Sequence, residues 1–162
     1  MSWFIAVSFY SAIAAYVLAA LTAYIYVRSE SDGPLTRAKQ LAALGNTLLL
    51  VVFLSRWGHY GRMPFTGLGD SLNLFLVMCA GIILTVQRDQ AMRPLMAYYM
   101  PALAILALVS GVFSPVSLGE APEELNGLFL VVHVTLIFLA FSMFFIASLT
   151  SMAYVNKAQS LK

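Results

Sequence analysis

Charged residues are scarce in this sequence: Asp, Glu, Lys and Arg together make up 10% of the 162 residues, whereas hydrophobic residues make up 61%. A soluble domain normally carries about 25% charged residues, so this chain has too few of them to cover a globular surface. Nucleic acid is excluded as a partner, because the chain contains no basic run and no basic stripe with interleaved aromatic residues. The composition therefore predicts an integral membrane protein whose surface contacts the lipid bilayer.

Cysteine and the usual catalytic motifs are also nearly or wholly missing. Cys79 is the only cysteine, so the chain cannot form an internal disulfide bond. There is no Cys-x-x-Cys-His segment, no zinc-ligand spacing, no phosphate-binding glycine loop and no serine nucleophile with a recognisable base. The sequence alone therefore contains no complete catalytic site, and whether the chain takes part in an enzyme stays open.

Five apolar runs are long enough to cross a hydrocarbon core, which takes roughly 20 residues of helix. They lie at about 4–27, 38–57, 71–87, 94–113 and 128–155. We therefore predict an all-α fold, a single bundle of five transmembrane helices within residues 1–162. Asp70 is expected to cap the start of the third helix. Asn46 lies deep in the second run, and its amide is expected to find a partner on another helix.

The basic residues indicate the orientation of these runs. One side of a five-span arrangement carries Arg28, Arg37, Lys39, Arg88, Arg93, Lys157 and Lys162. The other side has only Arg56 and Arg62. Because Lys and Arg in short loops stay in the cytoplasm, we expect the N-terminus outside and the C-terminus in the cytoplasm, in the bacterial inner membrane.

The two histidines are candidate cofactor ligands. His133 lies inside the fifth run, roughly 8 Å below its outer end at 1.5 Å per residue. An ionisable residue inside a span indicates a functional site, and a neutral imidazole can bind haem iron axially. The alternative is a buried histidine that is hydrogen-bonded to a serine, a backbone carbonyl or Asn46. His59 follows the second run on the same outer side, either as a second haem ligand or as a solvated interfacial residue.

The polar segment 56–72 carries both arginines of the outer side. Basic residues are few there, so we expect Arg56 and Arg62 to serve an anionic ligand, such as a haem propionate. Within the segment, three groups follow one another in a fixed register: Arg56-Trp57, Gly61-Arg62-Met63-Pro64 and Gly69-Asp70-Ser71-Leu72. A further short segment opens the fifth run: Leu130-Val131-Val132-His133-Val134-Thr135.

In order and spacing, these groups resemble the signature of the CcsA (ResC) membrane subunit of system II cytochrome c synthases, in the haem-handling superfamily that includes CcmC and CcmF. The resemblance implies that His133 is a haem ligand near the outer face. In this register Arg62 replaces the family's loop histidine and Asp70 replaces its glutamate, while His59 lies three residues before the replaced histidine. The family's tryptophan-rich haem-binding loop has no counterpart, because Trp3 and Trp57 are the only tryptophans.

The resemblance therefore implies a counterpart of the front half of such a protein, a haem-handling subunit with haem b as cofactor and His133 on the iron. It would work within a larger complex, with other membrane subunits, one of them carrying the tryptophan-rich loop, and with apocytochrome c. The alternative is a structural or quinone-facing membrane subunit of a respiratory electron-transfer complex, whose partners would be redox subunits.

Overall fold

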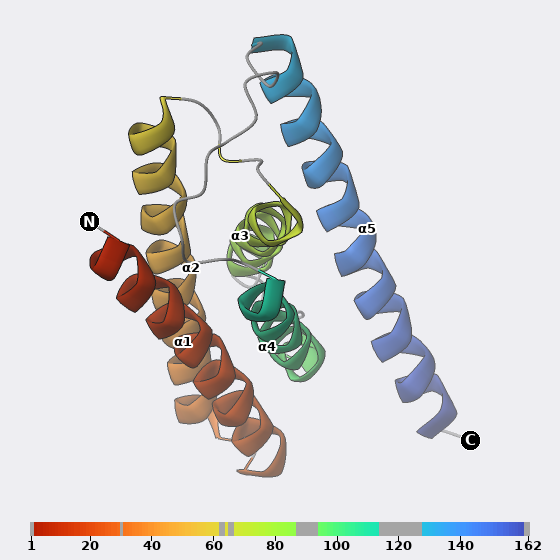
Figure 1. The fold of residues 1–162 in the computed structure, drawn as a ribbon. Helices are drawn as coiled ribbons and strands as arrows, with labels where there is room; N and C mark the ends of the chain where they lie inside the picture. Colours follow the sequence, from red (N-terminus) through yellow and green to blue (C-terminus); the bar gives the residue numbers. More distant parts are fainter. Residues whose placement is uncertain are drawn as a thin grey trace.

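The computed structural model of the protein describes residues 2–29, 31–61, 64, 67–86, 94–113 and 128–160. Within them the chain forms five α-helices (Figure 1): α1 Ser2–Ser29, α2 Asp32–Tyr60, α3 Leu68–Val86, α4 Met96–Phe113 and α5 Leu128–Ser160. All five are long and apolar enough to cross a membrane. The prediction of an all-α fold is confirmed, and the chain is an integral membrane protein.

Several helices extend beyond the apolar runs that predicted them. α2 begins at Asp32 rather than at 38, and α5 continues to Ser160 rather than ending near 155. Hydropathy locates only the apolar stretch, whereas a helix continues through polar residues of high helix propensity, such as Arg37 and Lys39 at the start of α2. The five helices therefore coincide with the five apolar runs, and at these ends the helices extend beyond the runs.

The helices pack unequally. α1 and α2 form the most extensive pair, and α4 also packs against α1. α3 packs against α2 and α4, while α5 packs against α3 and, less closely, against α4. In Figure 1, α3 and α4 lie between the α1–α2 pair and α5. The last helix therefore forms one edge of the bundle.

Small side chains line the contact between α1 and α2. The alanines that are completely buried on these two helices are Ala12, Ala19, Ala23, Ala38 and Ala42. A Cβ atom added at Gly45 would lie 3.1 Å from the Tyr16 ring and 3.2 Å from the Ala12 carbonyl oxygen. Next to it, the Tyr16 hydroxyl donates to Asn46 Oδ1 at 3.4 Å, which confirms the expectation that this amide has a partner on another helix. Small residues let the two backbones approach closely where lipid provides no hydrophobic driving force.

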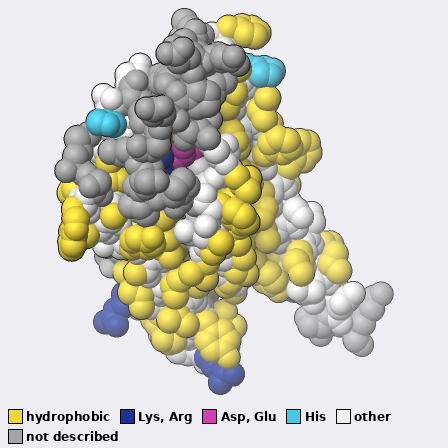
Figure 2. Space-filling view, viewed as in Figure 1, with side chains coloured by type: hydrophobic (Ala, Val, Ile, Leu, Met, Phe, Trp, Pro, Cys, Tyr) yellow, Lys and Arg dark blue, Asp and Glu magenta, His cyan; other side chains and the backbone are white. Residues whose placement is uncertain are grey.

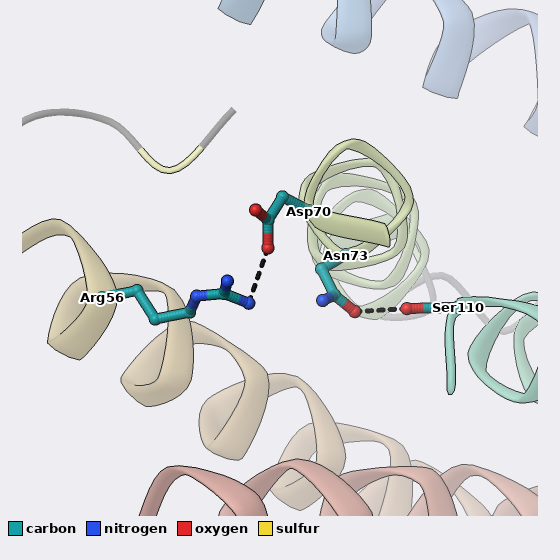
Figure 3. Close-up of polar contacts among 4 residues, drawn as sticks. All are labelled: Arg56, Asp70, Asn73 and Ser110. Atoms are coloured by element: carbon teal, nitrogen blue, oxygen red, sulfur yellow. Dashed lines mark hydrogen bonds and ion pairs between the residues drawn. The ribbon is translucent and has the colours of Figure 1, made fainter. Parts of the chain in front are cut away.

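Polar contacts join the remaining helices inside the bundle. The Ser110 hydroxyl of α4 donates to Asn73 Oδ1 of α3 (Figure 3), and both residues are buried. The hydroxyl oxygens of Tyr99 on α4 and Thr150 on α5 lie 2.7 Å apart. Interhelical hydrogen bonds of this kind are a main source of specificity between helices in a membrane.

Replacement of Gly45 by valine is expected to lower the thermal stability of the detergent-solubilised protein. The added carbons would meet the Tyr16 ring and the Ala12 carbonyl, and overpacking of this kind typically costs about 1–3 kcal/mol. The matched control is Gly58→Val on the same helix, because a Cβ at Gly58 has nothing within 4 Å. Thermal unfolding followed by circular dichroism should show a lower midpoint for Gly45→Val. An equal drop in both variants would contradict the close contact between α1 and α2.

Candidate functional site

A buried ion pair joins the end of α2 to the start of α3. The Arg56 Nη1 atom lies 2.6 Å from the Asp70 Oδ1 atom, and each side chain is only 6% exposed (Figure 3). Arg56 lies near the C-terminal end of α2, and Asp70 lies in the first turn of α3. A buried charge without its partner is strongly destabilising, so the pair holds these two helix ends together.

Glycine and proline shape the chain between the two charges. Gly61 ends α2 in the left-handed conformation (φ 65°), and its N–H donates to the Trp57 carbonyl oxygen at 2.9 Å. This is the conformation that lets glycine close a helix and satisfy one of its last carbonyls. Pro64 is fully buried. Gly61 therefore ends α2, and Pro64 is a buried residue between the two helices.

The prediction that Asp70 caps the third helix is wrong in position. α3 begins at Leu68, so Asp70 lies inside the first turn and not at the cap. Leu68 and Gly69 already take helical conformation, and the Ser71 N–H donates to the Gly67 carbonyl oxygen at 3.1 Å. The Asp70 carboxylate is directed instead to Arg56.

The sequence predicts an anionic ligand for Arg56, and the structure gives its Nη1 atom an anionic partner within the chain. The Arg56 Nε atom is buried and has no hydrogen-bond partner among the described residues. Sequence analysis does not pair Arg56 with Asp70, although a lone acid and a lone base at the edges of two apolar runs are a usable signal. Arg62, the other predicted arginine, lies outside the described residues.

His133 is exposed, so the structure does not support the alternative of a buried histidine that is hydrogen-bonded within the bundle. The inward side of α5 includes Ser142, which is completely buried, and Ala153, which is 5% exposed. His133 precedes Ser142 by nine residues, and at about 100° per residue this places it roughly half a turn away, on the outward side. Its ring stacks on that of Phe129, with centroids 6.0 Å apart and planes 7° apart. The imidazole therefore faces the surroundings of the bundle.

The two histidines lie at one end of the molecule without meeting. His59 is exposed in the last turn of α2. α2 ends and α5 begins at the same end of the bundle (Figure 1). Figure 2 shows the two histidine side chains (cyan) at this end, on separate parts of the surface. The expectation that both belong to one side of the protein is consistent with this arrangement, but the structure does not bring them together.

A groove of about 580 Å³ lies between α3 and α5. It is lined by Leu68, Ser71, Leu72 and Phe75 from α3 and by Phe138, Phe141, Phe144 and Phe145 from α5. The rings of Phe75 and Phe145 meet edge to face, with centroids 5.6 Å apart. The Ser71 hydroxyl is the polar side-chain group among these lining residues. Such walls suit a flat or chain-like apolar ligand group.

The candidate cofactor ligands among the described residues are the two histidine rings. Among these residues, no three His, Cys, Asp or Glu side chains come together to hold a metal ion. Haem iron needs fewer protein ligands, often a single axial imidazole. His133 and His59 each present an exposed ring that can supply one.

A double-mutant cycle on the ion pair tests its structural role. Arg56→Met and Asp70→Asn are each expected to lower the free energy of unfolding, because either breaks the buried Arg56–Asp70 ion pair, and breaking such a pair typically costs roughly 3–5 kcal/mol. The double variant should lose clearly less than the sum of the two, since both single losses include the same interaction. Denaturation of the solubilised protein measures all four species, with Arg37→Met as an exposed-arginine control. Additive losses would show that the two side chains do not interact.

The chain was compared with known proteins. No family profile and no solved structure matches it. Two curated relatives from Prochlorococcus marinus, strains MIT 9303 and MIT 9313, are each named cytochrome c biogenesis protein CcsA. Each is 28% identical over 128 residues, a match that covers 75% of this chain and 40% of the relative. The chain is thus similar to CcsA over most of its own length, while it spans 40% of the length of the curated relatives it matches.

Proposed function

We propose that this chain is a haem-handling membrane subunit of cytochrome c biogenesis, working within a larger complex in the bacterial inner membrane. The observation that carries the proposal is the similarity to CcsA, at 28% identity over 128 residues. The buried pair of Arg56 and Asp70 supports it, because both residues belong to the segment that resembles the family's loop signature. Because the match covers 40% of the relatives' length, the proposal concerns residues 1–162 and not the whole activity of those relatives.

In this proposal His133 is the axial ligand of a haem b. Its exposed imidazole can offer one nitrogen to iron, while stacking on Phe129 restrains the plane of the ring. His59 is the second candidate ligand, from the end of α2. Arg62 is one candidate donor to the propionates, and Arg56 is the other, through an Nε–H that has no hydrogen-bond partner among the described residues. The haem supplies the group to which apocytochrome c becomes attached through thioether bonds, and that chemistry belongs to the whole complex.

The outward face of α5 supports the presence of a partner subunit. His133 is exposed there together with Phe129, which is 84% exposed, and Phe144, which is 75% exposed. Lipid contact alone suits the two phenylalanines, but an ionisable ring inside a span is costly without a partner or a role. In this proposal a second membrane subunit, which carries the tryptophan-rich loop, covers this face of α5. Apocytochrome c is bound by the assembly of the two.

The distribution of basic side chains supports an orientation with the N-terminus outside. Arg28 lies in the last turn of α1, and Arg37 and Lys39 follow near the start of α2. Figure 2 shows exposed basic side chains (dark blue) at the end of the bundle opposite the histidines. Since basic ends stay in the cytoplasm, the histidines and the Arg56–Asp70 pair would lie toward the outer face.

The second candidate function is a quinone-facing or structural subunit of a respiratory complex. The groove between α3 and α5 favours it, because its phenylalanine walls could hold the isoprenoid tail of a quinone. Neither His133 nor His59 is among the described residues that line this groove. In this role the subunit would copurify with redox subunits and carry no haem of its own.

Replacement of His133 by alanine is expected to remove most of the haem b that copurifies with the assembly, because it removes the proposed iron ligand. Pyridine haemochrome analysis measures the haem per protein, and immunoblotting checks that expression stays near the wild-type level. The matched control is Leu136→Ala, because Leu136 is also exposed on α5, at 58%. Unchanged haem occupancy in His133→Ala would remove the ligand assignment. Equal losses in both variants would point to a disturbed α5 instead.

Labelling of single cysteines tests the proposed orientation. Cys79 is completely buried, so the native thiol provides an unreactive background. Gly67→Cys should react with a membrane-impermeant maleimide in intact spheroplasts, because Gly67 is exposed at the proposed outer end. Ser31→Cys, in the exposed turn between α1 and α2, should react only after the membrane is permeabilised. The opposite labelling pattern would reverse the orientation and place the histidines toward the cytoplasm.

A further inference from the structure

A second groove lies at the opposite end of the bundle, between the start of α4 and the end of α5. Its volume is about 540 Å³, and its lining includes Leu95, Tyr98, Thr150, Ala153, Asn156 and Lys157. Ala153 is buried, whereas Asn156 and Lys157 are exposed at the rim. The groove thus has an apolar interior and a polar, basic edge.

Hydrogen bonds hold the two walls of this groove in place. The hydroxyl oxygens of Tyr99 and Thr150 lie 2.7 Å apart between α4 and α5. Closer to the end of α5, Asn156 Nδ2 donates to the Tyr98 hydroxyl oxygen at 3.4 Å. The Tyr98 hydroxyl therefore lies next to Asn156, which precedes Lys157 in the chain, and all three residues line the groove.

The surroundings of the groove are basic. Lys157 is a cation in its lining, and no acidic residue lines it among the described residues. A neighbouring groove of about 530 Å³ shares Pro94 and Tyr98 with it and reaches Val27 at the end of α1. Arg28 follows directly, and its guanidinium lies 5.1 Å from the centroid of the Tyr24 ring. Arg28 of α1 and Lys157 of α5 therefore both lie at this end of the molecule, with Arg37 and Lys39 of α2.

We propose that the groove between α4 and α5 binds an anionic phospholipid, with an acyl chain along Leu95 and Ala153 and the phosphate at Lys157, Tyr98 and Asn156. In a bilayer an open groove between spans is filled by lipid, and a basic rim at the end of a span favours anionic headgroups. Lysine can cover apolar surface with its methylene stem while its ammonium reaches the headgroup. The site lies at the other end from the histidines, so it stands independently of the proposed haem role.

The test uses native mass spectrometry of the full chain in a neutral detergent, with phosphatidylglycerol or phosphatidylcholine added at matched concentrations. The protein should retain phosphatidylglycerol in preference to phosphatidylcholine. Lys157→Gln should lower the affinity for phosphatidylglycerol about fivefold, the size expected for one cation near an anionic headgroup. Tyr98→Phe should lower it further in combination. The matched control is Arg37→Gln, an exposed basic residue on α2 at the same end, which should keep wild-type retention.

Three outcomes would overturn the assignment. Equal retention of both lipids would show an unselective lipid surface. An equal loss in Lys157→Gln and Arg37→Gln would show that overall charge, and not this groove, determines binding. Displacement of phosphatidylglycerol by sodium phosphate at millimolar concentration would show a site for the free anion and not for a lipid. Circular dichroism of each variant confirms that the helices remain folded.

Discussion

Hydrocarbon offers no hydrogen-bond partner to a polar side chain, so the polar groups within these spans have to be satisfied by the protein. The chain meets this constraint in a regular way, because a polar contact links each helix to the next. These contacts are Tyr16–Asn46, Arg56–Asp70, Asn73–Ser110 and Tyr99–Thr150, in the order α1–α2, α2–α3, α3–α4 and α4–α5. The ion pair is the one of these four contacts that joins opposite charges, and breaking a buried pair typically costs several kcal/mol.

The ion pair also fixes the two helix ends on either side of the polar segment after α2. Arg56 lies near the end of α2 and Asp70 near the start of α3. Their contact therefore holds together the two helix ends that the segment connects. His59 lies between them in sequence, in the last turn of α2. His59 therefore lies on a helix whose end is held by a buried ion pair, and a site built on a packed helix is more precise than one on a loop. This support is what a haem-handling role at the outer end would require.

Much of the fold follows from the sequence, because a membrane requires long apolar helices and the sequence contains five apolar runs. The partner of Asn46 was expected on the same grounds, since an amide in a span needs one. The pairing of Arg56 with Asp70 depends on how the end of α2 and the start of α3 lie in space, which no periodicity reveals. The sequence also does not predict whether His133 faces the bundle or its surroundings, because α5 is apolar all round and its pattern indicates no inward face.

A reduced-minus-oxidised spectrum of the mildly solubilised wild-type assembly tests the central claim most directly, when it is recorded together with identification of the copurifying chains. A haem-handling subunit predicts a haem b signal that follows this chain through purification, accompanied by a membrane protein with a tryptophan-rich loop. Stable copurification with respiratory redox subunits, and no haem assignable to this chain, would contradict the haem-handling role and support the quinone-facing or structural one.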